Sequence, residues 1–210
     1  MSEPLSQAIN AEQWAEVLSD VGHHLERLGV SARLCVIGSV ACMFDGADTR
    51  TSIDCDVWVP GSQFHRKVLR EAAEAAGLMF DPKQEVVESP YLQLVSPGIV
   101  EVGDYDKDVL ISNSGKLSLS RPPVENLIAS KLLRGSEKDI ADIAGLLTRH
   151  PTVTPDAVEK VLETFPSASR NKAAENLVFL HVLQKAESIP DRPSHKESTR
   201  NRQNEQSRQY

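Results

Sequence analysis

The sequence has little cysteine, few aromatic residues and no excess of positive charge. Its three cysteines do not form a CxxC pair and lie in apolar segments, which favours free buried thiols over a redox or metal role. Aromatic residues make up 5% of the chain, and the formal net charge is −7. A negative chain is not expected to coat nucleic acid through a general basic surface, although a local basic groove is compatible with this composition.

Long apolar segments are also missing. No stretch approaches the roughly 18 continuous apolar residues of a membrane-spanning helix. Residues 1–10 lack the basic region followed by an apolar run that marks a signal peptide, so we expect a cytoplasmic protein that does not associate with membranes. Hydrophobic residues nevertheless make up 40% of the chain, which is enough for a folded core.

Hydrophobic periodicity divides the chain into an α/β half, residues 1–121, and a helical half, residues 122–187. The polar segment 188–210 has no periodicity and is expected to be a disordered tail. In the first half we expect helices over 11–28, 39–46 and 63–76, and strands over 33–38, 52–59, 91–95, 98–103, 108–112 and 116–120. The last two strands are expected to form a hairpin, and 98–103 to pair with 91–95.

Several residues are predicted to mark helix ends. Asn10, Ser62, Ser136 and Thr154 have the side chains that cap helix N-termini, and Gly135 is expected to end the helix before it. These signals are local, so they predict the boundaries of helices rather than their packing.

Two aspartates, Asp54 and Asp56, interrupt the apolar strand 52–59. Residues two apart in a strand face the same way, at a separation of roughly 6.6 Å. In a partly buried site their charges would repel unless a cation lay between them. Carboxylate oxygens suit Mg²⁺ or Mn²⁺ best, so we predict a metal site here. The alternative is that both side chains face water on an exposed side of the sheet.

Gly38 and Ser39 lie where a predicted strand passes directly into a helix, shortly before the aspartates. A glycine-containing turn at a helix N-terminus exposes backbone N–H groups and lets a phosphate approach. This order places a predicted phosphate site beside the predicted metal site. Arg50 precedes the aspartates and is either a further phosphate contact or an exposed side chain.

The segments VIGSVA and RTSIDCDVWV together resemble the signature of the nucleotidyltransferase fold of the DNA polymerase β superfamily, hydrophobic-Gly-(Gly/Ser) followed by DxD on the next strand. The resemblance implies an α+β fold, with a mixed sheet flanked by helices and followed by a small helical C-terminal subdomain. It also implies that Asp54 and Asp56 bind the divalent metal that holds a nucleoside triphosphate (NTP), with Gly38 and Ser39 contacting its phosphates.

The segment ENLIASKLLRGSEKDIADIAGLL is similar to the lysine helix and KDxxDL segment of AbiEii-type minimal nucleotidyltransferases, several of which are toxins of toxin–antitoxin systems. The resemblance covers about residues 34–147. It implies that Lys131 on one helix, and Asp139 and Asp142 on the next, complete the site.

Each of these three residues has a structural alternative. Lys131 could only extend its ammonium group past neighbouring leucines towards solvent. Asp139 could form a capping box with Ser136, three residues earlier. Asp142 could pair with Lys138, four residues before it on the same helix.

Catalytic members of the superfamily usually carry a third carboxylate on a later strand, and its identity is open here. The candidates are Glu101, Asp104, Asp106 and Asp108, or none of them. A site without this acid would lack a base or second-metal ligand near the attacking hydroxyl.

The sequence thus predicts a Mg²⁺- or Mn²⁺-dependent enzyme that moves a nucleoside monophosphate from an NTP to an acceptor hydroxyl. The acceptor could be a tRNA end, a protein or a small molecule. The enzyme could be the toxin of a toxin–antitoxin or phage-defence system, with a cognate antitoxin as partner. The alternative is a catalytically degenerate module of such a system that binds a nucleotide or a partner protein.

Overall fold

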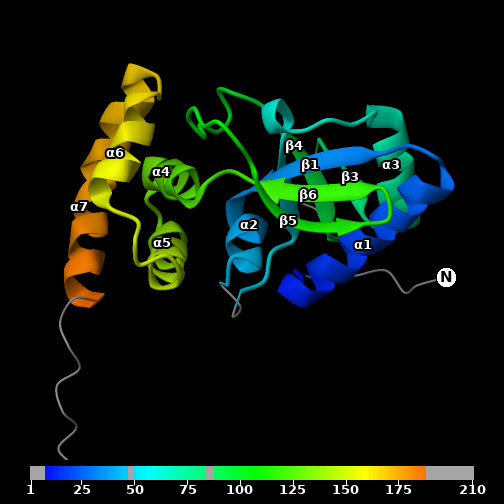
Figure 1. Cartoon of the computed structure of the whole chain (residues 1–210), viewed down its shortest axis with the longest axis horizontal. Coiled ribbons are helices and arrows are strands. Elements are labelled where there is room, and N and C mark those ends of the chain that lie inside the picture. The colour runs from blue at the N-terminus through cyan, green and yellow to red at the C-terminus, as the bar shows by residue number, and fades with distance from the viewer. Residues whose placement is uncertain (1–7, 47–49, 84–87, 188–210) are drawn as a thin grey trace, which may run out of the picture.

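The computed structural model describes residues 8–46, 50–83 and 88–187, and its centre is a six-stranded sheet (Figure 1). The strand order is β3-β4-β2-β1-β6-β5. The strands are β1 (Ala32–Ile37), β2 (Asp54–Trp58), β3 (Met79–Phe80), β4 (Tyr91–Val95), β5 (Val109–Ser114) and β6 (Leu117–Arg121). β1 runs antiparallel to β2 and parallel to β6, and β2 runs parallel to β4. The predicted α+β class with a mixed sheet is therefore confirmed.

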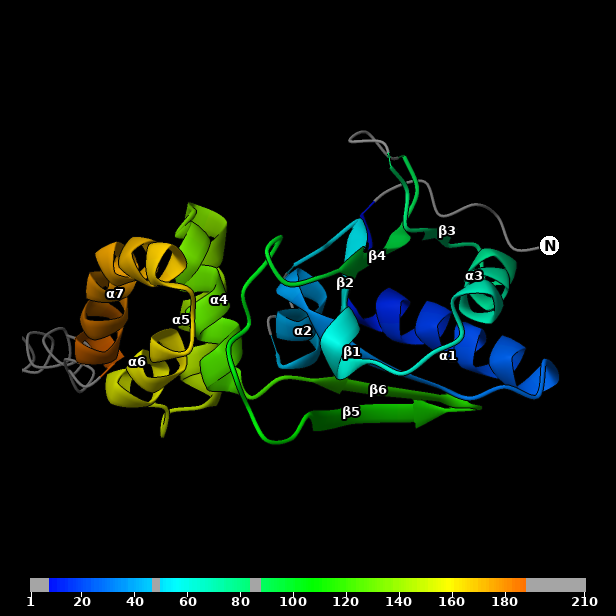
Figure 2. The same cartoon turned by 90° about the horizontal axis from the view of Figure 1, so that it is seen from above.

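Helices cover one face of the sheet and form a separate group beside it (Figure 2). The helices are α1 (Ala11–Arg27), α2 (Gly38–Phe44), α3 (Arg66–Ala75), α4 (Val124–Arg134), α5 (Glu137–Arg149), α6 (Pro155–Glu163) and α7 (Ser167–Glu187). α1 packs against α3, and α4 packs against α5, α6 and α7. Among the described residues, no helix combines the length and apolar character needed to cross a membrane. The tail predicted over 188–210 lies outside the described residues.

The predicted helix ends are largely confirmed, because capping depends on side chains within one turn of the chain. The Asn10 side chain accepts a hydrogen bond from the backbone N–H of Gln13 at 2.9 Å, and the backbone N–H of Asn10 donates to Gln13 Oε1 at 3.1 Å. Ser136 forms the equivalent capping box with Asp139, and Gly135 has the left-handed φ of 63° that ends α4.

Ser62 is not the cap that its sequence position predicts. α3 begins only at Arg66, and the Ser62 hydroxyl instead donates to the Trp58 carbonyl oxygen at 2.7 Å. It also accepts a hydrogen bond from the Cys35 backbone N–H at 2.9 Å. Ser62 therefore ties the short 3-10 helix η1 (Val59–Gly61) to β1.

The strand predicted over 98–103 is also wrong. Val100 makes only an isolated bridge to Pro97, and the segment does not join the sheet. Its expected partner, β4, is paired with β2 along one edge, and along the other edge it is paired with β3 at Tyr91 and Leu92 and donates from the Leu94 N–H to Asp81. Hydrophobic alternation indicated an extended segment but could not show that the edge was occupied.

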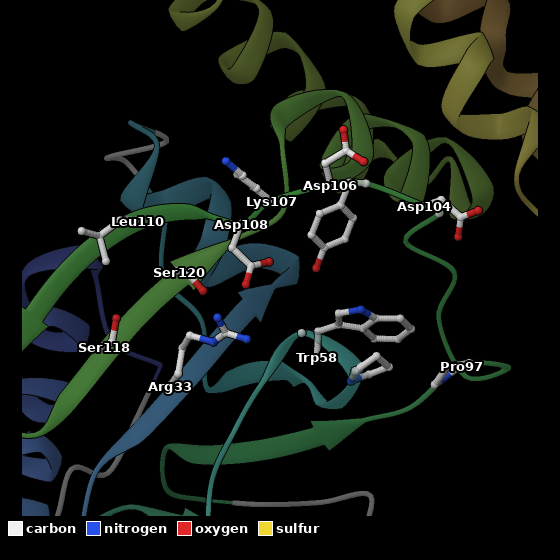
Figure 3. Close-up of a pocket in the computed structure, with 14 residues that line it drawn as sticks. Arg33, Trp58, Pro97, Asp104, Asp106, Lys107, Asp108, Leu110, Ser118 and Ser120 are labelled. Atoms are coloured by element: carbon white, nitrogen blue, oxygen red, sulfur yellow. The ribbon is translucent and has the colours of Figure 1, made fainter.

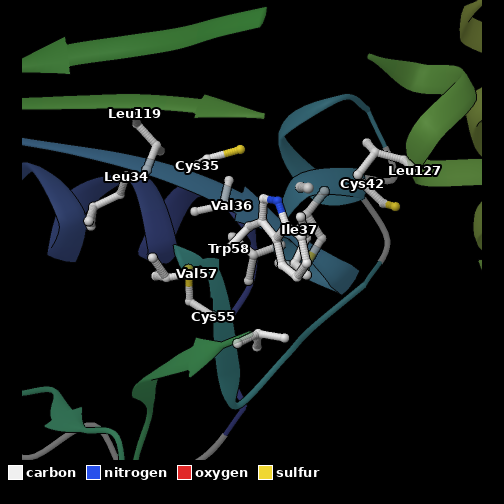
Figure 4. Close-up of a cluster of buried hydrophobic side chains, with 14 of the residues drawn as sticks. Leu34, Cys35, Val36, Ile37, Cys42, Cys55, Val57, Trp58, Leu119 and Leu127 are labelled. Atoms are coloured by element: carbon white, nitrogen blue, oxygen red, sulfur yellow. The ribbon is translucent and has the colours of Figure 1, made fainter. Parts of the chain in front are cut away.

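The core lies on the face of β2 opposite its aspartates. Cys55 and Val57 are fully buried, whereas Asp54 and Asp56 alternate with them and are only partly covered. Figure 4 shows Cys55 and Val57 close to Leu34 and Val36 of the neighbouring strand β1. All three cysteines are buried and free. The strand thus presents an apolar face to the core and an acidic face to the other side.

Gly22 is predicted to be essential for seating α1 on the β5–β6 hairpin. A Cβ at this position would overlap the carbonyl oxygen of Ser114 in the hairpin, which cannot move freely because it is backbone. We expect Gly22→Ala to lower the free energy of unfolding by about 1–3 kcal/mol through overpacking.

Gly145 on α5 is the matched control, because it is also a mid-helix glycine but has open space around its Cβ position. Gly145→Ala should stabilise the protein by up to about 1 kcal/mol through helix propensity alone. Urea denaturation of both variants measures the difference, and equal effects would contradict the role given to Gly22.

Candidate active site

The Gly38-Ser39 bend and the Asp54/Asp56 pair are adjacent in the structure. Ile37, the last residue of β1, pairs with Asp56 of β2, and α2 begins at the next residue. Gly38 has a φ of 67°, and a Cβ there would lie only 2.5 Å from Asp56 Oδ2. A glycine is therefore required for the backbone bend to lie against the Asp56 carboxylate.

The two aspartates face a hollow of about 200 Å³ that the helical half of the chain helps to enclose. Ser39 lines it from α2, and the other lining residues come from the end of α4 and the start of α5. These are Arg134, Ser136, Lys138 and Asp139. The hollow therefore combines acidic side chains of the sheet with basic side chains of the helices.

The electrostatics of the pair favour a bound cation. Burial raises the pKa of Asp56 to about 6, and the neighbouring negative charge of Asp54 adds to the rise. Ser52 donates a hydrogen bond to Asp54 Oδ1 at 2.7 Å. Two hard carboxylate donors on one strand face fit a Mg²⁺ ion that takes its other ligands from a nucleotide and water. No group of three or more His, Cys, Asp or Glu side chains suited to a metal occurs among the described residues.

Lys131 and Asp142 form a buried ion pair that joins α4 to α5. Lys131 Nζ lies 2.6 Å from Asp142 Oδ2 and 3.5 Å from Asp139 Oδ1, and all three side chains are at most 3% exposed. Arg50 Nη1 lies 2.9 Å from Asp142 Oδ1 without hydrogen-bond geometry, and Arg50 also donates to the Lys138 carbonyl. The pairing of Asp142 with Lys138 suggested by helix spacing is therefore wrong, and Arg50 is held by α5.

Asp139 forms the capping box and also binds Arg134. Ser136 Oγ donates to Asp139 Oδ2 at 2.6 Å, and Arg134 Nη2 donates to Oδ1 at 2.7 Å. Burial alone would raise the pKa of Asp139, but these hydrogen bonds from Ser136 and Arg134 hold it below its usual value. Asp139 thus remains charged and orients Arg134 at the edge of the hollow.

Arg134 and Lys138 also line the hollow, although the sequence motifs did not predict them. Arg134 also lines a second hollow of about 50 Å³ with Gly38, Asp56 and Lys131, so it borders both hollows to which Asp56 contributes. Its side chain is 59% exposed and therefore accessible to a ligand, in contrast to Lys131 at 3%. The available signal was its position three residues after Lys131, which puts both on one side of the helix.

The strand beside the aspartates carries no acid. In the parallel pair β2–β4, Tyr91 lies opposite Asp54 and Gln93 lies opposite Asp56. None of the four predicted candidates for a third carboxylate belongs to β4, since they occupy the segment between β4 and β5. The nearest position for such an acid is therefore taken by glutamine.

Three of those candidates, Asp104, Asp106 and Asp108, line a separate hollow of about 800 Å³. Figure 3 shows the side chains of Asp108 and Arg33 turned into it, with Trp58 at its lower border. Trp58 lies two residues after Asp56 on β2, so the larger hollow opens on the same face of the sheet as the acidic pair.

Two residues that line the larger hollow, Asp108 and Tyr105, contact the buried Cys35, whose thiol lies 3.4 Å from Asp108 Oδ1 and 3.6 Å from the Tyr105 hydroxyl. Burial raises the pKa of the Cys35 thiol to about 12, so it stays protonated. A protonated buried thiol is a poor nucleophile, which leaves Cys35 as a structural hydrogen-bond donor to Asp108.

Comparisons with known proteins bear on the fold. No protein-family profile and no curated protein matches the sequence. The solved structure of an antigenic nucleotidyltransferase-like protein from Paracoccidioides brasiliensis is similar, with a TM-score of 0.52 over 86% of this chain and 95% of that chain, at 15% identity. The fold is nucleotidyltransferase-like. This agrees with the fold predicted from the sequence, whereas membership of the superfamily and the narrower likeness to AbiEii-type enzymes stay predictions.

Proposed function

We propose that the protein is a Mg²⁺-dependent nucleotidyltransferase that moves a nucleoside monophosphate from an NTP to an acceptor hydroxyl. The observation that supports this best is the contact between the Gly38 bend and Asp56 in a nucleotidyltransferase-like fold. In the reaction the acceptor oxygen forms a bond to the α-phosphorus, the bond to the β-phosphate oxygen breaks, and pyrophosphate leaves. The acceptor proton passes to water. Bound Mg²⁺ would stabilise the negative charge that develops on the phosphates.

Different residues of the chain would bind the ion and the triphosphate. Asp54 and Asp56 would hold the ion, and the Gly38-Ser39 backbone would orient the triphosphate. Arg134 is better placed than Lys131 to neutralise phosphate charge, because it is exposed beside both aspartates while Lys131 is committed to Asp142.

The larger hollow beyond Trp58 is our proposed place for the acceptor. It shares a sheet face with the aspartates, and its volume of about 800 Å³ suits a ligand of small-molecule size or one end of a larger molecule. Arg33 and Asp108 turn opposite charges into it, so it offers both a donor and an acceptor of hydrogen bonds (Figure 3). The candidate acceptors are a tRNA end, a protein and a small molecule, which labelled NTPs distinguish; a toxin role with a cognate antitoxin stays a prediction from the sequence.

A second candidate function, a nucleotide-binding module with little turnover, is favoured by Gln93. The residue opposite Asp56 is a neutral amide, so a carboxylate that could bind a second ion or accept the acceptor proton is not found there.

Incubation with each of the four α-labelled NTPs and Mg²⁺, in the presence of cellular RNA, protein and small-molecule fractions, tests both functions. Transfer of label that EDTA abolishes supports the enzyme, and the labelled fraction identifies the acceptor class. Calorimetric binding of an NTP without labelled product supports the binding module. Neither binding nor transfer with any NTP contradicts both functions.

Arg134→Gln is expected to weaken NTP binding by about tenfold, corresponding to about 1.4 kcal/mol, because one charge-assisted phosphate contact is lost. Since the Arg134 side chain is 59% exposed, its ion pair with Asp139 should contribute less than about 1 kcal/mol to stability. Titration calorimetry measures the affinity. Arg170→Gln, on the exposed surface of α7, is the control and should bind normally. Equal NTP affinities of the two variants would show that Arg134 does not contribute to NTP binding.

A further inference from the structure

Gln93 belongs to a row of side chains that crosses the sheet at the level of Asp56. The register places Gln93 of β4 opposite Asp56 of β2, and Leu92 opposite Phe80 of β3. Asp81 comes directly after Phe80, and its backbone N–H donates to the Leu92 carbonyl oxygen, so Asp81 lies beside Gln93 at the end of this row. Neighbouring strands lie about 4.8 Å apart and paired residues face the same side of the sheet, so the register makes Gln93 the residue of β4 nearest to Asp56.

The orientation of the Gln93 amide is fixed by Asp81. Gln93 Nε2 donates to Asp81 Oδ1 at 2.9 Å, and the Leu94 backbone N–H donates to the same oxygen at 3.2 Å. Arg66 binds the other oxygen of Asp81. Because a carboxylate accepts hydrogen bonds only, the amide nitrogen must face Asp81, which leaves the neutral amide oxygen as the group that Gln93 can offer to a cation.

Asp81 itself cannot replace the missing acid. Its charge is neutralised by Arg66, both of its oxygens are occupied, and β4 separates it from Asp56. The acidic ligands available at the hollow are therefore Asp54 and Asp56, since Asp139 is bound by Ser136 and Arg134.

We propose that the site takes a single divalent cation together with the nucleotide, and that Gln93 is the residue that prevents a second cation from binding. The inference rests on the proposed nucleotidyltransferase function. Two cations in one active site lie about 3.5–4 Å apart and repel each other strongly, so they need several carboxylates around them. A neutral amide provides an oxygen but no charge, and the second position next to Asp56 stays too weak for a divalent ion.

An exchange of side chains between positions 81 and 93 tests this directly. The double variant Asp81→Asn/Gln93→Glu keeps the total charge and allows a hydrogen bond between the two side chains, with the amide now the donor at position 81. It moves one carboxylate next to Asp56. Asp81→Asn alone is the control, since it removes the charge at position 81 without adding one at position 93. Gln93→Asp is a second variant in case the double variant does not fold, as judged by circular dichroism.

The measurement is the number of Mn²⁺ ions bound per chain, by electron paramagnetic resonance, with non-hydrolysable analogues of the four NTPs. We expect one ion for the natural chain and for Asp81→Asn, and two for the double variant or Gln93→Asp, with at least a tenfold faster transfer from NTP. Two ions on the natural chain, or one on both carboxylate variants, would overturn the inference and leave the proposed function standing. A natural chain that binds neither Mn²⁺ nor any analogue would instead refute the proposed function itself.

Discussion

Replacing Asp56 by asparagine is expected to abolish nucleotidyl transfer and to stabilise the protein in EDTA at pH 7. Transfer should fall at least about 1,000-fold, because the ion that stabilises the transferring phosphate loses a ligand. Stability should rise because burial and Asp54 raise the pKa of Asp56 to about 6, so that its ionised form is unfavourable in the folded state. We expect a gain of roughly 1–3 kcal/mol, at about 1.4 kcal/mol per pKa unit.

Because the pKa of Asp56 is raised in the folded state, the stability gained by Asp56→Asn should depend on pH. Folded Asp56 binds a proton more tightly than an unfolded aspartate, so the natural chain gains stability as the pH falls from above about 6 towards 4. The advantage of Asp56→Asn should therefore be largest at neutral pH and vanish below about pH 4. Denaturation curves in EDTA across this range measure it.

Asp54→Asn is the comparison that separates the effect on transfer from the effect on stability. It should also abolish transfer, but it leaves the buried Asp56 carboxylate in place. Transfer by the chain with both aspartates replaced would refute the mechanism. A neutral-pH destabilisation by Asp56→Asn would refute the electrostatic account of the pair.

Disruption of the buried Lys131–Asp142 pair should have the largest effect on stability. Both side chains are at most 3% exposed, so removal of either leaves a charge in the interior with fewer partners. Asp142→Leu is expected to cost about 3–5 kcal/mol, and Lys131→Met a similar amount. The double variant should cost far less than the sum, because no charge of the pair then remains buried.

Urea denaturation of the natural chain, the two single variants and the double variant measures the four free energies of this double-mutant cycle. Additive effects would show that the two charges do not depend on each other. The double variant also tests the role of Lys131: if it folds and still binds NTP, Lys131 positions α5 through Asp142 and does not contact phosphate. Loss of NTP binding by a folded double variant would instead support a direct contact between Lys131 and the phosphates, as the resemblance implies.

The features predicted correctly from the sequence are those that depend on neighbours along the chain. The Asn10 and Ser136 caps involve residues within one turn, and the β5–β6 hairpin is closed by a short turn at Gly115. The adjacency of Gly38 and Asp56 was also predicted, although they are far apart in sequence, because their motifs occur in the order of a known fold. The Ser62 cap was wrong because its hydroxyl is held by Trp58 and Cys35.

By itself, then, the sequence determined the α+β class, the ends of most helices and the presence of two acids on one face of a strand. Only the tertiary structure decided what surrounds those acids. Gln93 comes to lie opposite Asp56 through strand register, and Arg134 reaches the hollow through the packing of α4 beside the sheet. The commitment of Lys131 to Asp142 likewise depends on contact between α4 and α5. Register and helix packing depend on the free energy of the whole core, which no short segment of the sequence contains.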